Sequence, residues 1–144
     1  MIKNERQYRI TKAQAERFER ALAEVSARPA RSLPRALLKA QLDGLRSQLE
    51  DLRGELREYE ALRSGKRRSL ALESIEELPK TLIQARIAAG LSQEELAGKL
   101  GLKPQQIQRY EATNYQGASL ERVNEILRAL GVKLRRRAEL RLVS

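Results

Sequence analysis

The stretch Gly90–Glu111 reads GLSQEELAGKLGLKPQQIQRYE and carries the clearest local structural signals in this chain. Ser92, followed three residues later by Glu95, fits a capping box, in which each side chain bonds the backbone N–H of the other residue at the start of a helix. This helix is predicted to stop at Gly101, and a second helix is predicted over about residues 103–111. The stretch therefore predicts two short helices joined by a tight turn.

Three residues in this stretch suit the place where two such helices meet. Ala97 is small enough to let the helices approach closely, Gly101 accepts a positive φ in the turn, and Ile107 faces back from the second helix. The rest of the buried face is expected to come from Leu96, Leu100, Leu102 and Tyr110.

Two more helices are predicted around this pair. One spans about residues 79–90, and Ser74 with Glu77 fits a capping box in front of it. The other spans about residues 119–131 and carries an apolar stripe at helical spacing. Residues 79–131 are therefore predicted to form a domain of four to five helices.

Residues 1–65 are predicted to form a helical extension. A first helix is expected over residues 11–27 with Thr11 as its N-cap, and a second over residues 34–63. The second helix carries a heptad seam at Leu38, Leu42, Leu45, Leu49, Leu52, Leu56 and Tyr59. Such a seam fits a helical hairpin, a coiled coil between two chains, or an amphipathic helix packed on its own domain. Residues 66–78 are interpreted as a linker and lead-in.

Residues 132–144 change to a period of two, because apolar side chains alternate with charged ones from Val132 onward. This alternation predicts a short C-terminal β-strand. A strand needs a partner. Within the chain only Tyr8–Ile10 is a weak candidate, so pairing with the same tail of a second subunit is our leading hypothesis. A flexible basic tail is the alternative.

The composition narrows the chemistry. The 144 residues include 29 Lys and Arg against 19 Asp and Glu, a formal charge of +10, and neither His nor Cys. A zinc site of the usual kind, a His-paired nucleophile and a disulfide framework are therefore excluded. No Gly-rich phosphate loop or spaced acid cluster is present, so we expect no enzyme and no cofactor. No apolar run is long enough to suggest a membrane span or a signal peptide, and we expect a cytoplasmic, nucleoid-associated protein.

The excess positive charge predicts an anionic partner, with nucleic acid ahead of membrane. Four Tyr, one Phe and no Trp offer little material for stacking on unpaired bases, so double-stranded DNA is favoured over single strands. Residues 1–34 hold eight basic and four acidic side chains, and residues 132–144 hold five and one. We therefore expect both ends to contribute salt-sensitive affinity.

The sequence ARIAAGLSQEELAGKLGLKPQQIQRYE, within residues 76–131, resembles the XRE, or lambdoid phage repressor-like, helix-turn-helix family. The resemblance implies an all-α domain in which the helix ending at Gly101 crosses the DNA backbone and the next helix enters the major groove. It also implies a structural ion pair between Arg86 and Glu111. Pro104 departs from the family, since many members have a polar base-reading side chain there, and it suits the first helical turn instead.

The resemblance implies two groups of DNA contacts. Base reading falls to Gln105, Gln106 and Arg109, because Gln pairs with adenine and Arg with guanine through two hydrogen bonds each. Contacts to the DNA backbone are expected from Gln93, Lys103 and Gln108. The loop after Glu111 departs from the family because it lacks the usual Gly-rich turn, and its polar residues Thr113, Asn114, Tyr115 and Gln116 are expected to contact phosphates. For the last four residues an ordinary polar surface loop is the alternative.

The expected activity is that of a dimeric, sequence-specific transcriptional repressor on a pseudo-palindromic operator. The arrangement of a helical extension before the domain and a strand after it also resembles HigA-type antitoxins, which implies autoregulation and a toxin protein as partner. The alternative is an interaction module that neutralises a toxin, or acts as a coiled-coil adaptor, through the leucine seam, with DNA binding secondary.

Overall fold

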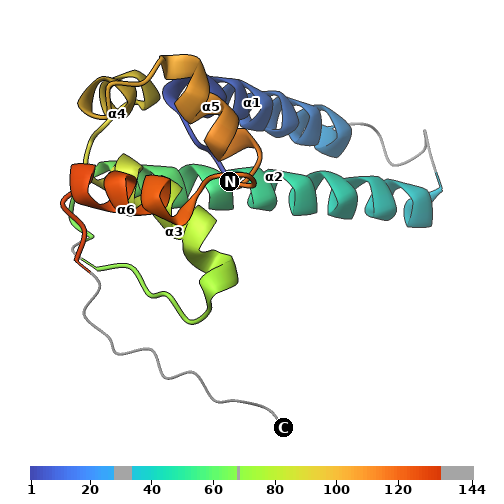
Figure 1. The fold of residues 1–144 in the computed structure, drawn as a ribbon. Coiled ribbons are helices and arrows are strands. Elements are labelled where there is room, and N and C mark those ends of the chain that lie inside the picture. Colours follow the sequence, from blue (N-terminus) through green and yellow to red (C-terminus); the bar gives the residue numbers. More distant parts are fainter. Residues whose placement is uncertain (28–33, 68, 134–144) are drawn as a thin grey trace, which may run out of the picture.

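The fold is helical throughout the part of the chain that the computed structural model describes, which comprises residues 1–27, 34–67 and 69–133. These residues form six α-helices and one 3₁₀ turn, and no strand (Figure 1). The elements are α1 (Glu5–Ala27), α2 (Arg35–Arg63), η1 (Ile75–Glu77), α3 (Leu78–Ala88), α4 (Gln93–Lys99), α5 (Pro104–Ala112) and α6 (Leu120–Ala129).

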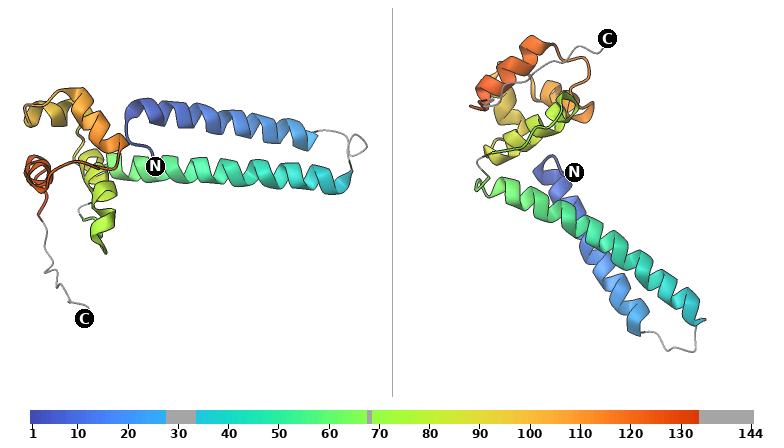
Figure 2. Two further views of the ribbon diagram at one scale, coloured as in Figure 1. Left: turned by 45° about the vertical axis from the view of Figure 1, so that its right-hand side comes forward. Right: turned by 90° about the horizontal axis from the view of Figure 1, so that it is seen from below.

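Helices α1 and α2 run antiparallel as a long hairpin, and the remaining helices gather at one end of it (Figure 2). The hairpin was one of the alternatives that the leucine seam left open. In this hairpin Tyr8 of α1 stacks on Tyr59 of α2 with ring centroids 5.2 Å apart, and Arg53 pairs with Glu19 at 2.8 Å. The first turn of α1 lies at the end where the small helices gather.

The start of α1 corrects two predictions. The helix begins at Glu5, so Thr11 is not its N-cap but a buried residue inside it, and Tyr8–Ile10 is helix rather than strand. Asn4 fills the capping position, since its Oδ1 accepts a hydrogen bond of 2.9 Å from the backbone N–H of Gln7. The early start extends the helix by almost two turns.

The leucine seam packs along α1 of the same chain. Leu49 and Tyr59 are buried, and the other seam positions are half-buried. A pair of helices covers only one side of such a seam, because each helix has a single neighbour. Part of the seam therefore stays accessible even though the hairpin uses it.

Local capping fixes where the short helices begin. Ser92 Oγ accepts from the Glu95 backbone N–H at 3.0 Å, and the Ser92 N–H donates to Glu95 Oε2 at 2.7 Å, which confirms this capping box. The hydrogen bond from the Ser92 backbone holds the pKa of the Glu95 carboxyl below its usual range. The capping box predicted for Ser74 is wrong, because Glu77 accepts instead from the backbone N–H of Glu73.

A single hydrophobic core joins the hairpin to the small helices. Ile2, Tyr59 and Leu62 come from the N-terminal part of the chain and pack in one cluster with residues of the C-terminal part. Those residues are Leu82, Ile83, Ile87, Leu96, Ala97, Ile107, Tyr115 and Ile126. The core thus connects the two parts of the chain that lie on either side of residues 66–78, the predicted linker.

The C-terminal strand predicted over residues 132–144 falls almost wholly outside the described residues. Val132 and Lys133 belong to the described part, and neither lies in a strand. The strand prediction therefore has no support. Among the helices of the described ranges, none has the length and apolar character needed to cross a membrane.

Candidate nucleic-acid interface

The turn between α4 and α5 has the geometry that its sequence predicted. Ala97 and Ile107 are fully buried where the two helices meet, and Gly101 adopts a φ of +66°. The backbone N–H of Leu102 donates to the carbonyl of Ala97 at 2.9 Å, which closes the end of α4. The turn fixes α5 against α4 and leaves the outer face of α5 in solvent.

That outer face carries the residues expected to read bases. Gln105, Gln106 and Arg109 are all exposed on α5, as is Gln108. Gln106 also has a local role, because its Oε1 accepts a 3.0 Å hydrogen bond from the backbone N–H of Lys103 at the start of the helix. Its amide nitrogen remains able to donate to a base, whereas Gln105 and Arg109 make no such capping contact.

Lys103 and Pro104 define how α5 begins. Lys103 is exposed at the N-cap position with extended backbone, and Pro104 occupies the first turn as expected. Proline is favoured there because the first N–H groups of a helix have no intrahelical partner. The first side chains of α5 that offer polar groups to a duplex are therefore Gln105 and Gln106.

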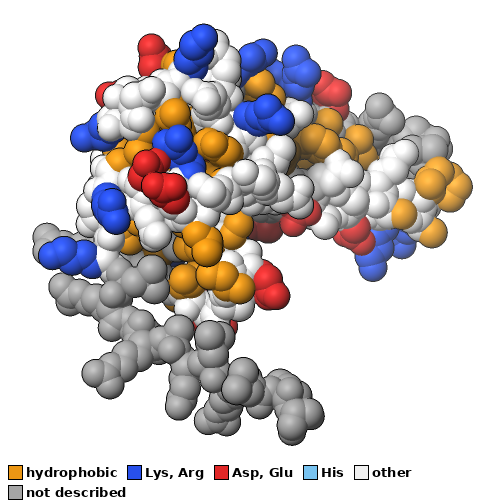
Figure 3. Space-filling view, viewed as in Figure 1, with side chains coloured by type: hydrophobic (Ala, Val, Ile, Leu, Met, Phe, Trp, Pro, Cys, Tyr) orange, Lys and Arg blue, Asp and Glu red, His pale blue; other side chains and the backbone are white. Residues whose placement is uncertain are grey.

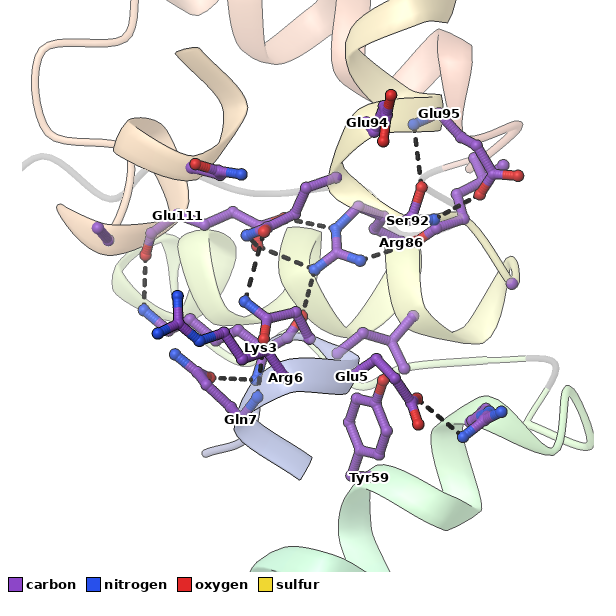
Figure 4. Close-up of a pocket in the computed structure, with 18 residues that line it drawn as sticks. Lys3, Glu5, Arg6, Gln7, Tyr59, Arg86, Ser92, Glu94, Glu95 and Glu111 are labelled. Carbon is purple, nitrogen blue, oxygen red and sulfur yellow. Dashed lines mark hydrogen bonds and ion pairs between the residues drawn. The ribbon is translucent and has the colours of Figure 1, made fainter. Parts of the chain in front are cut away.

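A buried ion pair ties α3 to the end of α5. Arg86 Nε donates to Glu111 Oε1 at 2.5 Å and Arg86 Nη2 to Glu111 Oε2 at 2.9 Å, with only 2% and 0% of the two residues exposed. The Arg86 guanidinium also donates to the carbonyls of Leu91, at 2.7 Å, and Lys3, at 2.6 Å (Figure 4). Its charge is thus compensated by a bidentate carboxylate and two carbonyls.

Gln93 extends this network to the start of α4. Its Nε2 donates to Glu111 Oε2 at 2.7 Å, and its Oε1 accepts from Asn4 Nδ2 at 3.4 Å. The side chain is half-buried. Gln93 therefore braces α5 against α4, and it stands beside the first turn of the hairpin.

The loop after α5 contains three exposed polar residues and one buried aromatic residue. Asn114 and Gln116 are exposed, and the exposed Thr113 donates from Oγ1 to the carbonyl of Arg109 at 2.9 Å. Tyr115, in contrast, is 6% exposed and adopts a φ of +58°. Its ring stacks on that of Tyr110, with the ring centroids 5.9 Å apart. Burial raises the pKa of the Tyr115 hydroxyl. Its expected contact with the DNA backbone does not fit this placement, because the hydroxyl points into the core.

Lys3 and Asn4 belong to this site although the sequence did not single them out. Lys3 Nζ donates to the carbonyl of Glu111 at 2.6 Å, across 108 positions of sequence. A cleft of about 850 Å³ is lined by residues of the first turn of α1 and of α4 and α5, among them Arg6, Gln7 and Gln108. In the space-filling view basic side chains stand over α5 and the adjoining part of α1 (Figure 3).

The described part of the site contains no group of His, Cys, Asp and Glu suited to hold a metal ion. Its charged and polar side chains are instead engaged with one another or exposed to solvent. The chemistry that they offer is hydrogen bonding and ion pairing to a ligand.

Comparison with known proteins finds a similarity in the C-terminal half of the chain. Residues 82–136 match the family model described as Helix-turn-helix. The match includes α4, the turn and α5, so this part of the chain has the arrangement of a helix-turn-helix domain and is similar to that family. No curated protein and no solved structure matches the chain. A helix-turn-helix domain suggests a DNA-binding transcription regulator, so DNA is the expected partner. The comparisons do not support the HigA-like subtype.

Proposed function

We propose that this protein is a sequence-specific transcriptional repressor that binds double-stranded DNA as a dimer and carries out no chemistry of its own. The observation that carries the proposal is the exposed face of α5, where Gln105 and Arg109 project from a helix held by the buried Arg86–Glu111 pair. In a major groove these side chains match the edges of adenine and guanine. The surrounding Lys103, Gln108 and exposed loop residues would then contact phosphates.

Replacing Gln105 and Arg109 together by Ala is expected to abolish sequence preference. Each bidentate base contact contributes about 1–3 kcal/mol of discrimination, so the loss of both predicts a drop of roughly 30-fold or more in specific affinity. A duplex selected by the wild-type protein from a random pool serves as the specific ligand, with fluorescence anisotropy as the measurement. Binding to a scrambled duplex should change little.

The matched control for this experiment is the double variant Gln14→Ala with Arg17→Ala. It removes the same two side-chain types from exposed positions of α1. The control is expected to retain sequence preference. Should the Gln105 and Arg109 variant also keep its ratio of specific to scrambled affinity, direct readout by α5 is excluded.

Dimer formation is the second part of the proposal. Two reading helices about 34 Å apart would meet successive major grooves of a pseudo-palindromic operator. The accessible part of the hairpin supports this, because Leu37 is 47% exposed and a groove of about 460 Å³ at the far end is lined by residues such as Val25, Gly44 and Leu45. A second hairpin would complete a four-helix arrangement there.

Changing Val25 and Leu45 to Gln should therefore convert the dimer to a monomer, because polar groups would replace the apolar lining of the groove. Light scattering at micromolar concentration measures the change, and circular dichroism checks that the hairpin still folds. Ile10→Gln is the matched control, since Ile10 is an exposed apolar residue toward the other end of α1. A dimer that survives in the groove variant would place the interface elsewhere, and a monomeric wild type would refute dimerisation.

A narrower form of the proposal is an autoregulating antitoxin whose hairpin binds a toxin protein. The same accessible groove supports an interaction module in which DNA binding is secondary. The Gln105 and Arg109 variant separates the two activities, because it changes α5 and leaves the hairpin groove intact. A repressor loses its operator, whereas an interaction module keeps its protein partner.

A further inference from the structure

We propose that Lys3 and Asn4, at the start of the hairpin, are positioning residues for the recognition helix α5, so that the DNA-reading unit includes a segment outside the helix-turn-helix domain. This inference rests on the DNA-binding function proposed above. The two residues act through Glu111 and Gln93, at the end of α5 and the start of α4.

Lys3 closes the C-terminal end of α5. The carbonyl of Glu111 is one of the last four of the helix, which have no partner within it, and Lys3 Nζ donates to this oxygen at 2.6 Å. A positive charge at this end is also favourable for the helix dipole. The carbonyl of Lys3 accepts from Arg86 at 2.6 Å, so the same residue contacts both sides of the buried ion pair.

Asn4 links the start of α1 to the start of α4. Its Oδ1 caps α1 through the backbone N–H of Gln7, while its Nδ2 donates to Gln93 Oε1. Gln93 in turn donates to Glu111. Movement of the first turn of α1 would therefore be transmitted to both helices of the helix-turn-helix unit.

Burial holds this segment in place. Ile2 is only 2% exposed and lies in the shared core with Leu62, directly before the two positioning residues. In Figure 4 Lys3 lies below Arg86 and Glu111, and Arg6 and Gln7 of the first turn of α1 lie beside it. Because an apolar anchor precedes the polar contacts, the position of Lys3 relative to α5 is set by packing as well as by hydrogen bonds.

Lys3→Met tests the role of Lys3, because Met keeps an unbranched side chain and removes the donor. Positioning predicts that affinity for the selected duplex falls about tenfold, as for loss of a charged hydrogen bond, while affinity for a scrambled duplex changes much less. The slope of log affinity against log salt should stay the same, since no phosphate contact is lost. Lys3→Arg should restore most of the preference, and Lys12→Met, at an exposed position of α1, is the matched control.

Asn4→Asp provides a second test that does not depend on the folding of the Lys3 variant. Asp keeps the oxygen that caps α1 and removes the amide donor to Gln93. We expect unchanged helix content by circular dichroism and a several-fold loss of preference for the selected duplex. If neither variant alters the preference, the positioning role is refuted.

Direct contact between Lys3 and phosphate is the competing outcome. It would weaken both duplexes alike and lower the salt slope by about one. That result would overturn the positioning role while leaving the DNA-binding function intact. A wild-type protein that binds no duplex would instead refute the proposed function itself.

Discussion

Replacing Glu111 by Gln is expected to remove about 3–5 kcal/mol of folding free energy, because the Arg86 guanidinium would be left buried without its counter-charge. The two residues are 0% and 2% exposed and share two hydrogen bonds. Gln has one acceptor oxygen where Glu111 has two, and its amide group would face the donors of Arg86 and Gln93. Domains of this size have about 5–15 kcal/mol of total stability, so the loss is a large fraction of it.

Urea unfolding followed by circular dichroism measures this effect. Glu50→Gln is the matched control, because Glu50 also pairs with an arginine, Arg57, at 2.6 Å, but both side chains are more than 60% exposed. Exposed ion pairs contribute little, so the control should unfold near the wild-type midpoint. Equal midpoints for the two variants would show that the buried pair does not stabilise the fold in the way described.

The buried pair can also be replaced as a unit. The double variant Arg86→Met with Glu111→Leu leaves no unpaired charge in the core and is expected to recover part of the stability that Glu111→Gln loses. It also removes the acceptor for Gln93 and the donor to the Lys3 carbonyl. Sequence preference for DNA should therefore remain lower than in the wild type even where stability returns.

Replacing Leu62 by Ala is expected to cost about 2–5 kcal/mol, through lost burial and the cavity left behind. Leu62 is fully buried in the last turn of α2 and packs in the cluster that includes Ile83 and Ile107. Because this core joins the hairpin to the helix-turn-helix domain, both should unfold together at lower urea concentration. One transition, seen by helix content and by tyrosine fluorescence alike, is the expected result.

Leu37→Ala supplies the comparison. It makes the same change on the same helix at a residue that is 47% exposed, and the expected change is within about 0.5 kcal/mol. Two separate transitions in the Leu62 variant would mean that the hairpin and the C-terminal helices fold independently. A loss no larger than that of the Leu37 variant would mean that the shared core contributes little.

The DNA-reading elements could be predicted from sequence because their signals are local. The capping pair Ser92 and Glu95, the positive φ of Gly101 and the buried Ile107 each depend on neighbours a few residues away. The family resemblance added the Arg86–Glu111 pairing, which the structure contains. The burial of Tyr115 could not be predicted from spacing, because a single aromatic residue in a polar loop belongs to no helical or strand periodicity.

The start of α1 carries a local signal of its own. Asn4 followed three residues later by Gln7 has the spacing of a capping box, and it fixes the helix start ahead of Thr11. Ser74 is the opposite case, because its spacing to Glu77 fits a capping box but its side chain makes no capping hydrogen bond. A three-residue spacing therefore indicates a helix start only where the tertiary contacts agree, because a single cap contributes about 1 kcal/mol.

Local signals in the sequence are enough to predict the two helices of the reading unit, their turn, and the side chains exposed on α5, because caps, glycine conformation and apolar period act over a few residues. That Ile2, Lys3 and Asn4 contact this unit from the other end of the chain is seen only in the folded molecule. Such contacts depend on how the hairpin packs on the helix-turn-helix domain. Local spacing carries no information about partners that lie about a hundred residues apart.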